Sequence, residues 1–236
     1  MPEELLVCHL PQVEYRAAVD LQETLRDRVQ AHELGDLLLL LEHPPVYTRG
    51  RRSDATEIPM GEAWYRAQGI DVVQTDRGGK LTYHGPGQLV GYPIMRIVDV
   101  IAYLRTMEDA MIAALAEEGI EAGPREGLTG VWVEDRKIAS IGVHVSRGVT
   151  THGFAINVIN DLQPFDWVVP CGLSGVRMTS VLSEAPGGTP PERLKCFRKR
   201  MAHQFAQAFG RRQRIVTPER LGIPGARIEP RAPLPI

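Results

Sequence analysis

The chain has 236 residues, a formal net charge of −2 at pH 7, and 43% hydrophobic and 24% charged residues. This length suits one large domain or two small ones with a sizeable core, and the charge balance gives no sign of nucleic-acid binding. Three widely spaced cysteines argue against a disulfide framework and for a reducing compartment. The longest apolar run, 37–41, is too short to span a bilayer, and the acidic start does not resemble a signal peptide. We therefore expect a cytoplasmic protein without membrane contact.

Strands and helices alternate in the first half of the chain. Hydrophobic spacing predicts, in order, a strand over 4–10, an amphipathic helix over 12–34 with Gly35 as its stop, a buried strand over 36–44, a short helix over 60–68 and a strand over 70–75. The apolar face of the first helix is predicted to hold Tyr15, Ala18, Leu21, Leu25 and Val29.

The second half adds two long helices and a run of strands. A strand over 88–97 precedes a helix over 99–118, whose inward face is predicted to hold Val100, Tyr103, Leu104, Met107, Met111, Ala114 and Leu115. Strands over 130–134, 137–145 and 150–158 follow, and their short connections predict antiparallel hairpins. The last helix, about 190–209, is predicted to bury Leu194, Phe197, Met201, Phe205 and Ala208.

These elements indicate one α+β domain over 1–216, with a mixed, largely antiparallel sheet flanked by helices. A proline-rich tail over 217–236 is predicted to be extended chain.

The segment 77–93, RGGKLTYHGPGQLVGYP, is rich in glycine but keeps polar side chains between the glycines. Glycine lets a backbone approach a ligand closely, so the segment has the character of a binding loop. A glycine-rich turn between two strands is the alternative.

Cys171 is a candidate nucleophile. A free cysteine is usually a small buried hydrophobe, and we expect this of Cys8 and Cys196. Cys171 differs because it follows a proline and has two glycines within four residues, in WVVPCGLSGVRMTS. Backbone N–H groups in such a turn favour a thiolate and the oxyanion of a tetrahedral intermediate.

A nucleophilic cysteine needs a base, and the candidates are His84, His144, His152 and Lys137. Lys137 opens a strand on which it shares a face with apolar residues: Ala139, Ile141, Val143 and Val145. Desolvation there would favour a neutral amine. The alternative is a lysine whose ammonium reaches solvent from the strand end.

Other site motifs are absent. The chain has no HExxH, no paired CxxC and no phosphate-binding loop, so we expect no metal and no cofactor. Two basic clusters, TRGRRSD at 48–54 and a longer one at 198–214, are either solvated faces or docking surfaces for an acidic partner. For the second cluster we expect the solvated face.

Five segments together resemble the lipoyl(octanoyl) transferase family: 43–50 (HPPVYTRG), 77–93, 135–145 (DRKIASIGVHV), 151–158 (THGFAINV) and 170–173 (PCGL). They occur in the family's order and span most of the chain, and the RGG-x-x-T-x-HGPGQ pattern is especially specific. The resemblance implies a fold like the catalytic domains of biotin protein ligases and lipoate-protein ligases. It places the acyl-accepting cysteine at Cys171 and its partner lysine at Lys137.

The implied substrate-binding residues lie in three of these segments. They are Arg77, Gly78, Gly79, Lys80, Leu81, Thr82, Tyr83, His84, Ser140, Ile141, Gly142, Gly153, Phe154 and Ala155. In this interpretation the main chain of 77–93 closes over the acyl chain. Gly85 and Gly87 belong to the tunnel wall, and Gly87→Val should disfavour long acyl donors without affecting folding.

The activity that the resemblance implies is acyl transfer. An octanoyl group passes from octanoyl-acyl-carrier protein to Cys171 and then to a lysine of a lipoyl domain, in 2-oxoacid dehydrogenase complexes or the glycine cleavage H protein. A thioester donor is already activated, so the reaction requires no nucleotide. Two alternatives are an ATP-dependent lipoate or biotin protein ligase and a non-catalytic module that binds carrier proteins.

Overall fold

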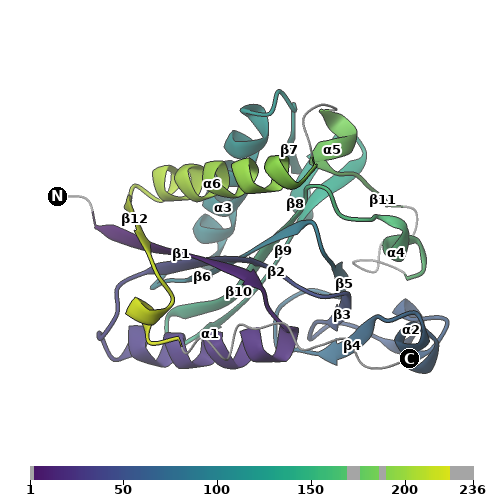
Figure 1. The fold of residues 1–236 in the computed structure, drawn as a ribbon, viewed down its shortest axis with the longest axis horizontal. Helices are drawn as coiled ribbons and strands as arrows, with labels where there is room; N and C mark the ends of the chain where they lie inside the picture. The colour runs from purple at the N-terminus through teal and green to yellow at the C-terminus, as the bar shows by residue number, and fades with distance from the viewer. Residues whose placement is uncertain (1–2, 169–175, 186–189, 224–236) are drawn as a thin grey trace.

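The computed structural model describes residues 3–168, 176–185 and 190–223 (Figure 1). Within these residues a nine-stranded sheet has the order β12-β1-β2-β6-β10-β9-β8-β7, with β11 paired to β9. Its strands are β1 (Glu4–Gln12), β2 (Leu37–Glu42), β6 (Gln88–Ile94), β7 (Gly123–Arg125), β8 (Leu128–Val133), β9 (Arg136–Ser146), β10 (Val149–Asn157), β11 (Arg177–Met178) and β12 (Arg212–Val216). The pairs β12–β1, β1–β2 and β11–β9 are parallel, and the others are antiparallel. The predicted mixed, largely antiparallel sheet is confirmed.

Helices cover both faces of this sheet. The longer helices are α1 (Tyr15–Gln30) on one face, and α3 (Val100–Ala116) and α6 (Pro190–Ala208) on the other (Figure 1). The shorter ones are α2 (Glu62–Ala67), α4 (Gln163–Asp166) and α5 (Val181–Glu184).

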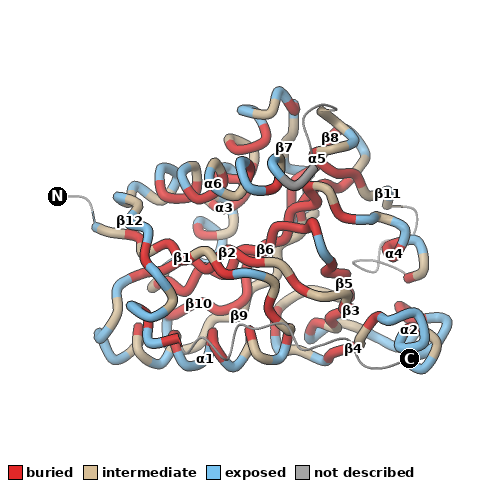
Figure 2. The backbone as a smooth tube through the Cα atoms, in the orientation of Figure 1, coloured by how far each residue is buried: buried red, intermediate tan, exposed pale blue. Residues whose placement is uncertain are grey.

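Strand β2 explains why five leucines follow one another in the sequence. Leu37, Leu39 and Leu41 pack in the core on the α1 side, whereas Leu38 and Leu40 pack in the core that includes α3 and α6. Successive side chains of a strand point to opposite faces, so a strand covered on both sides must be apolar throughout. Figure 2 shows the same burial along the neighbouring strands of the sheet.

A second, three-stranded sheet was not predicted. It consists of β3 (Val46–Arg49), β4 (Asp71–Gln74) and β5 (Leu81–His84), in the order β4-β3-β5. Only β4 was expected as a strand: β3 follows a pair of prolines, and β5 lies within the glycine-rich segment. Between β4 and β5, the segment that begins at Arg77 reaches β9 of the main sheet, where Gly78 N–H donates to the carbonyl of Val143.

Some predicted details are wrong at element ends. The first helix ends at Gln30, four residues before the predicted limit. Val100 is 40% exposed because it is the first residue of α3, and Ala208, the last residue of α6, is also exposed. Cys196 is exposed on α6, whereas Cys8 is buried as expected.

The packed part of the chain continues beyond the predicted domain end. Residues 219–221 form a 3-10 turn, and Leu221 and Ile223 are buried against the α1 side of the core. Residues 224–236, the rest of the predicted tail, lie outside the described residues. The domain boundary at 216 and 217 stays a prediction. No helix in the described ranges is long and apolar enough to cross a bilayer.

Candidate active site

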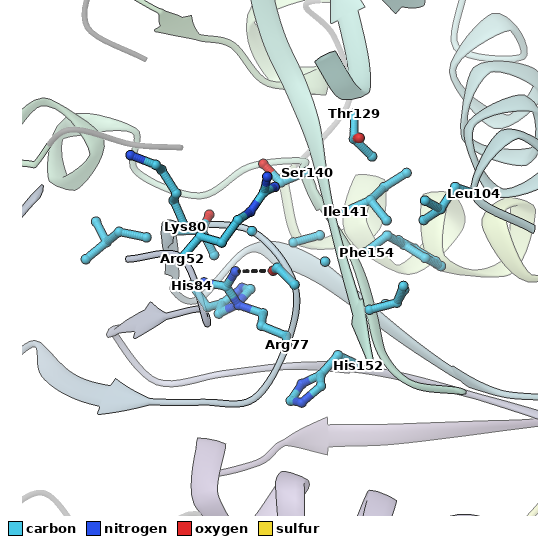
Figure 3. A pocket seen from close by; sticks show the side chains of 18 of the residues that line it. Arg52, Arg77, Lys80, His84, Leu104, Thr129, Ser140, Ile141, His152 and Phe154 are labelled. Atoms are coloured by element: carbon cyan, nitrogen blue, oxygen red, sulfur yellow. Dashed lines mark hydrogen bonds between the residues drawn. The ribbon is translucent and has the colours of Figure 1, made fainter. Parts of the chain in front are cut away.

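A cavity of about 480 Å³ lies between the segment 77–84, strands β9 and β10, and helix α3 (Figure 3). All the predicted substrate-binding residues except Tyr83 line it, and so does Lys137. The remaining lining residues were not in the predicted substrate-binding set: Tyr15, Arg52, Tyr92, Leu104, Gly127, Leu128, Thr129, Val143 and His152. Cys171, the candidate nucleophile, lies outside the described residues.

The two ends of the cavity differ in polarity. Leu104, Ile141 and Phe154 lie together at one end, and Arg52 and Lys80 lie at the other (Figure 3). A cavity of this form can hold an apolar chain at one end and leave a polar or charged group at the other.

Arg77 fixes the segment 77–84 to the second sheet. Its guanidinium donates to Thr48 Oγ1, at 3.1 Å from Nε and 2.8 Å from Nη2, and to the carbonyl of Gly78 at 3.0 Å. The side chain is only 7% exposed. Arg77 is thus a clamp that orders the backbone of the cavity wall.

Glycines let this segment approach β9 closely. Gly78 N–H donates to the carbonyl of Val143 at 2.9 Å. A Cβ on Gly142 would lie 2.9 Å from the carbonyl oxygen of Gly78, closer than a side chain can lie to backbone. Gly142 is therefore required by the close approach of the two chain segments. Of the two interpretations of the glycine-rich segment, a loop that forms a binding wall fits this geometry.

Gly85 and Gly87, by contrast, are required by the backbone conformation and packing and not by the cavity. Neither lines the cavity. Gly87 has a φ of +87°, and a Cβ there would lie 2.8 Å from the backbone nitrogen of Asn160. The expectation that Gly87→Val leaves folding unchanged is wrong, because the substitution forces both a clash and a left-handed backbone on a β-branched residue.

Tyr83 also points away from the cavity. Its ring packs against Tyr47 and Phe165, in a cluster that also contains Leu81, whereas its strand neighbours Thr82 and His84 line the cavity.

His84 is held as a neutral imidazole in the cavity wall. Gln88 Nε2 donates to Asn157 Oδ1 at 2.9 Å and to the carbonyl of Tyr83, so Gln88 Oε1 must be the group that faces His84. His84 Nδ1 lies 2.7 Å from that oxygen and therefore carries the proton. Burial lowers the pKa of His84 well below its usual value. Its Nε2 is thus an acceptor.

His43, which the sequence did not single out, supports this wall from behind. Its Nδ1 donates to the carbonyl of Val13 at 2.6 Å, and its Nε2 accepts from Tyr92 Oη at 2.7 Å. Its ring lies edge-on to His84, with centroids 5.5 Å apart. Complete burial lowers the pKa of His43 to about 4.

His144 and His152, two of the candidate bases, both contact Asp76. His152 Nε2 lies 2.7 Å from Asp76 Oδ1, and His144 Nδ1 lies 3.0 Å from Oδ2. Burial lowers the pKa of His152, which is therefore neutral and donates to the carboxylate, and this hydrogen bond lowers the pKa of Asp76. His144 does not line the cavity. His84, His144 and His152 thus all have hydrogen-bond partners within the fold.

Lys137 is 4% exposed and lines the cavity from β9. Ile141 and Val143 of the predicted apolar face line the cavity as well. The carbonyl of Lys137 accepts from Thr179 N–H at 3.0 Å, and the carbonyl of Thr179 accepts from Asn157 at 3.0 Å. The segment that follows the candidate nucleophile is therefore tied to both β9 and β10.

The structure also bears on metal binding and on the second basic cluster. No group of three or more His, Cys, Asp or Glu side chains in the described part of the chain could hold a metal ion. The basic cluster at 198–214 is ion-paired: Arg198 with Glu42 at 2.9 Å, and Arg200 with Glu117 at 2.7 Å. This pairing agrees with a solvated, structural face.

Comparisons with known proteins place this geometry in context. The lipoyl protein ligase A/B catalytic domain matches residues 14–206. The chain is 39% identical to an octanoyltransferase of Acidobacterium capsulatum over 223 residues, which cover 87% of this chain and 90% of the relative. It is 49% identical to an octanoyltransferase of Salinispora tropica over 179 residues, covering 72% and 81%.

Solved structures agree at the level of the fold. A bipartite lipoate protein ligase from Thermoplasma acidophilum, studied with its E2 lipoyl domain, superimposes with a TM-score of 0.69 at 19% identity. The match covers 94% of this chain and 90% of that one.

The buried histidines predict a stability that falls in mild acid. Below the usual value of 6.5 the unfolded chain binds a proton that folded His43 does not bind until about pH 4. Stability due to His43 is therefore complete above pH 6.5 and decreases between 6.5 and 4, by about 3 kcal/mol. His84 and His152 act in the same direction.

Urea unfolding at several pH values measures this effect. His43→Gln should flatten the dependence between pH 6.5 and 4, whereas the exposed control His203→Gln should not. An equally steep dependence in His43→Gln would show that His43 is not buried as a neutral ring.

Proposed function

Because the chain belongs to the lipoyl protein ligase A/B catalytic-domain family, we propose that it is an octanoyltransferase of protein lipoylation. The observation that carries the proposal is the convergence of 77–84, 140–142 and 153–155 on one cavity that also contains Lys137. The octanoyltransferases to which the chain is 39% and 49% identical support the same activity.

The acyl chain lies in the apolar end of the cavity, against Leu104, Ile141 and Phe154. Burying methylene groups there contributes about 0.8 kcal/mol each. The thioester carbonyl then lies toward the polar end, beside the wall that contains His84.

Cys171 and Lys137 perform the chemistry. Lys137 accepts the proton of the Cys171 thiol, and the sulfur attacks the carbonyl carbon of the donor thioester. Backbone N–H groups near Cys171 and at Gly142 bind the oxyanion. The carrier thiolate leaves with the proton from Lys137, and the octanoyl group remains on Cys171 as a thioester.

The acceptor lysine completes the cycle. Its neutral amine attacks the acyl-cysteine, an amide bond forms, and the Cys171 thiolate leaves. Lys137 takes the proton that the amine loses and returns it to the thiolate. Two half-reactions through one covalent intermediate make the kinetics ping-pong.

The partners follow from this chemistry. Octanoyl-acyl-carrier protein is the donor, and lipoyl domains of 2-oxoacid dehydrogenase complexes and the glycine cleavage H protein are the acceptors. Of the cluster 48–54, Arg51 and Arg52 are exposed, and Arg52 reaches the cavity. Arg49 pairs with Glu62 at 3.7 Å and belongs to the fold. Arg51 and Arg52 are therefore the docking residues for an acidic carrier.

Acylation of Cys171 is the direct test of the proposal. After mixing with octanoyl-acyl-carrier protein and without ATP, intact-protein mass spectrometry should show one octanoyl adduct, absent in Cys171→Ala and present in Cys8→Ala and Cys196→Ala. Lys137→Met should slow acylation by ~10²–10⁴-fold, as expected for loss of a general base. Lys137→Arg should not restore it, because a guanidinium does not deprotonate.

An adduct that persists in Cys171→Ala would exclude this mechanism. Transfer only with ATP and free acid would indicate a ligase, and no adduct from any donor would indicate a binding module.

Leu104 should set the preferred chain length. Leu104→Ala lengthens the apolar end of the cavity and should shift the optimum from octanoyl toward decanoyl donors, by about fourfold in kcat/KM per methylene accommodated. Leu104→Phe should shift it toward hexanoyl donors. Ile101→Ala, on the exposed side of the same helix, is the matched control. Identical chain-length profiles in both Leu104 variants and the control would place the acyl chain elsewhere.

Docking through arginine should be visible in the salt dependence of turnover. Arg51→Ala with Arg52→Ala should lower kcat/KM for the carrier-protein donor and flatten its decrease with salt. The matched control removes two exposed charges from α6, with Lys195→Ala and Lys199→Ala, and should keep the wild-type salt dependence. Equal losses in both double variants would refute a localised docking site.

A further inference from the structure

Trp132 is a buried aromatic residue next to Lys137 that the mechanism above does not use. The two residues are cross-strand partners on β8 and β9. Lys137 Nζ lies 5.3 Å from the centroid of the indole ring. A cation within about 6 Å of an indole face is attracted by the ring, and more strongly when both groups are desolvated. Trp132 is 2% exposed and Lys137 is 4% exposed.

The backbone around Trp132 is shaped to admit the lysine side chain. The pairing of β8 with β9 shifts by one residue between Val131 and Trp132, which is a β-bulge. Bulges re-aim side chains and are frequent beside active sites. Gly130, just before the bulge, has a φ of +123°, and a Cβ there would lie 2.8 Å from Lys137 Cε. The same Cβ would lie 2.5 Å from the carbonyl oxygen of Ala139, so glycine at this position lets β8 pass close to both the backbone of β9 and the lysine side chain.

A buried carboxylate on α3 binds the backbone of β8 at Gly130. Glu108, on α3, is 1% exposed and accepts from Gly130 N–H at 2.8 Å. Its other oxygen pairs with Arg105 at 2.6 Å. Gly130, Trp132 and Glu108 therefore form a built support, here called the lysine cradle.

Other charged or titratable groups lie near the lysine cradle. Arg125 is exposed and lies over the same indole, with Cζ 5.2 Å from the centroid. Arg136, next to Lys137, pairs with Glu184 at 2.6 Å. His84, Lys80 and Arg52 share the cavity with Lys137.

We propose that Trp132 is a positioning residue that stabilises the ammonium form of Lys137. The inference rests on the proposed function, in which the proton of Cys171 Sγ moves to Lys137 Nζ. The ring attracts the ammonium product and not the neutral amine, so it shifts this proton transfer toward the thiolate. Trp132 itself touches neither the donor nor the acceptor.

To test this role, the rate at which iodoacetamide alkylates Cys171 is measured as a function of pH. The background is Cys8→Ala/Cys196→Ala, so that Cys171 is the cysteine that reacts. Trp132→Leu removes the ring, and it should move the midpoint of the profile to higher pH and lower the rate at pH 7 about tenfold. Trp132→Phe keeps a weaker ring face and should fall between wild type and Trp132→Leu. If Trp132 only supported the fold, the alkylation rate of each variant would decrease in proportion to its loss of thermal stability, and the midpoint of the pH profile would not move.

Three controls separate the possible failures. Lys137→Met must itself move the profile; if it does not, the base assignment of the proposed function fails. If Lys137→Met moves the profile but both Trp132 variants match wild type, the cradle inference fails alone. Arg125→Gln and Trp64→Phe should leave the profile unchanged. A shift in Arg125→Gln as large as in Trp132→Leu would assign the effect to Arg125 and overturn the inference.

Discussion

The close backbone approach between the segment 77–84 and strand β9 is the constraint on which the rest of the site depends. A hydrogen bond from Gly78 N–H to the carbonyl of Val143 joins this segment to the main sheet. The two backbones can approach so closely because Gly142 has no side chain. Arg77 secures the same segment from the other side through Thr48. The contact between Gly78 and Val143 is made by backbone groups, so it does not limit which side chains line the cavity, and these can differ in polarity from one end to the other.

Burial then decides which groups can act as acids or bases. His43 and His84 are kept neutral by desolvation, with their tautomers fixed by a backbone carbonyl and by Gln88. Lys137 is buried in the same cavity, with its Nζ 5.3 Å from the centroid of the Trp132 ring. In the proposed mechanism Lys137 is therefore the base, and the neutral His84 belongs to a polar, uncharged part of the cavity wall.

The sequence predicted the fold and most of the site for identifiable reasons. The hydrophobic period determined the long helices, and the run of leucines determined β2. The family resemblance implied thirteen residues that line the cavity and one that does not, Tyr83, whose direction depends on a strand that was not predicted. Leu104 was predicted as a core residue of α3, because an apolar residue that lines a cavity has the same spacing as one that fills a core. Tyr92 was missed for the same reason, and Arg52 because its approach to the cavity depends on the second sheet.

The central claim is that the octanoyl chain occupies this cavity while it is bound to Cys171. A crystal structure of the acylated protein, trapped with octanoyl donor in the absence of acceptor, tests it most directly. We expect density for a thioester on Cys171, with the end of the chain against Leu104, Ile141 and Phe154, and with Lys137 Nζ between the sulfur and the Trp132 ring. An octanoyl group on another residue, or a chain that runs outside this cavity, would contradict it.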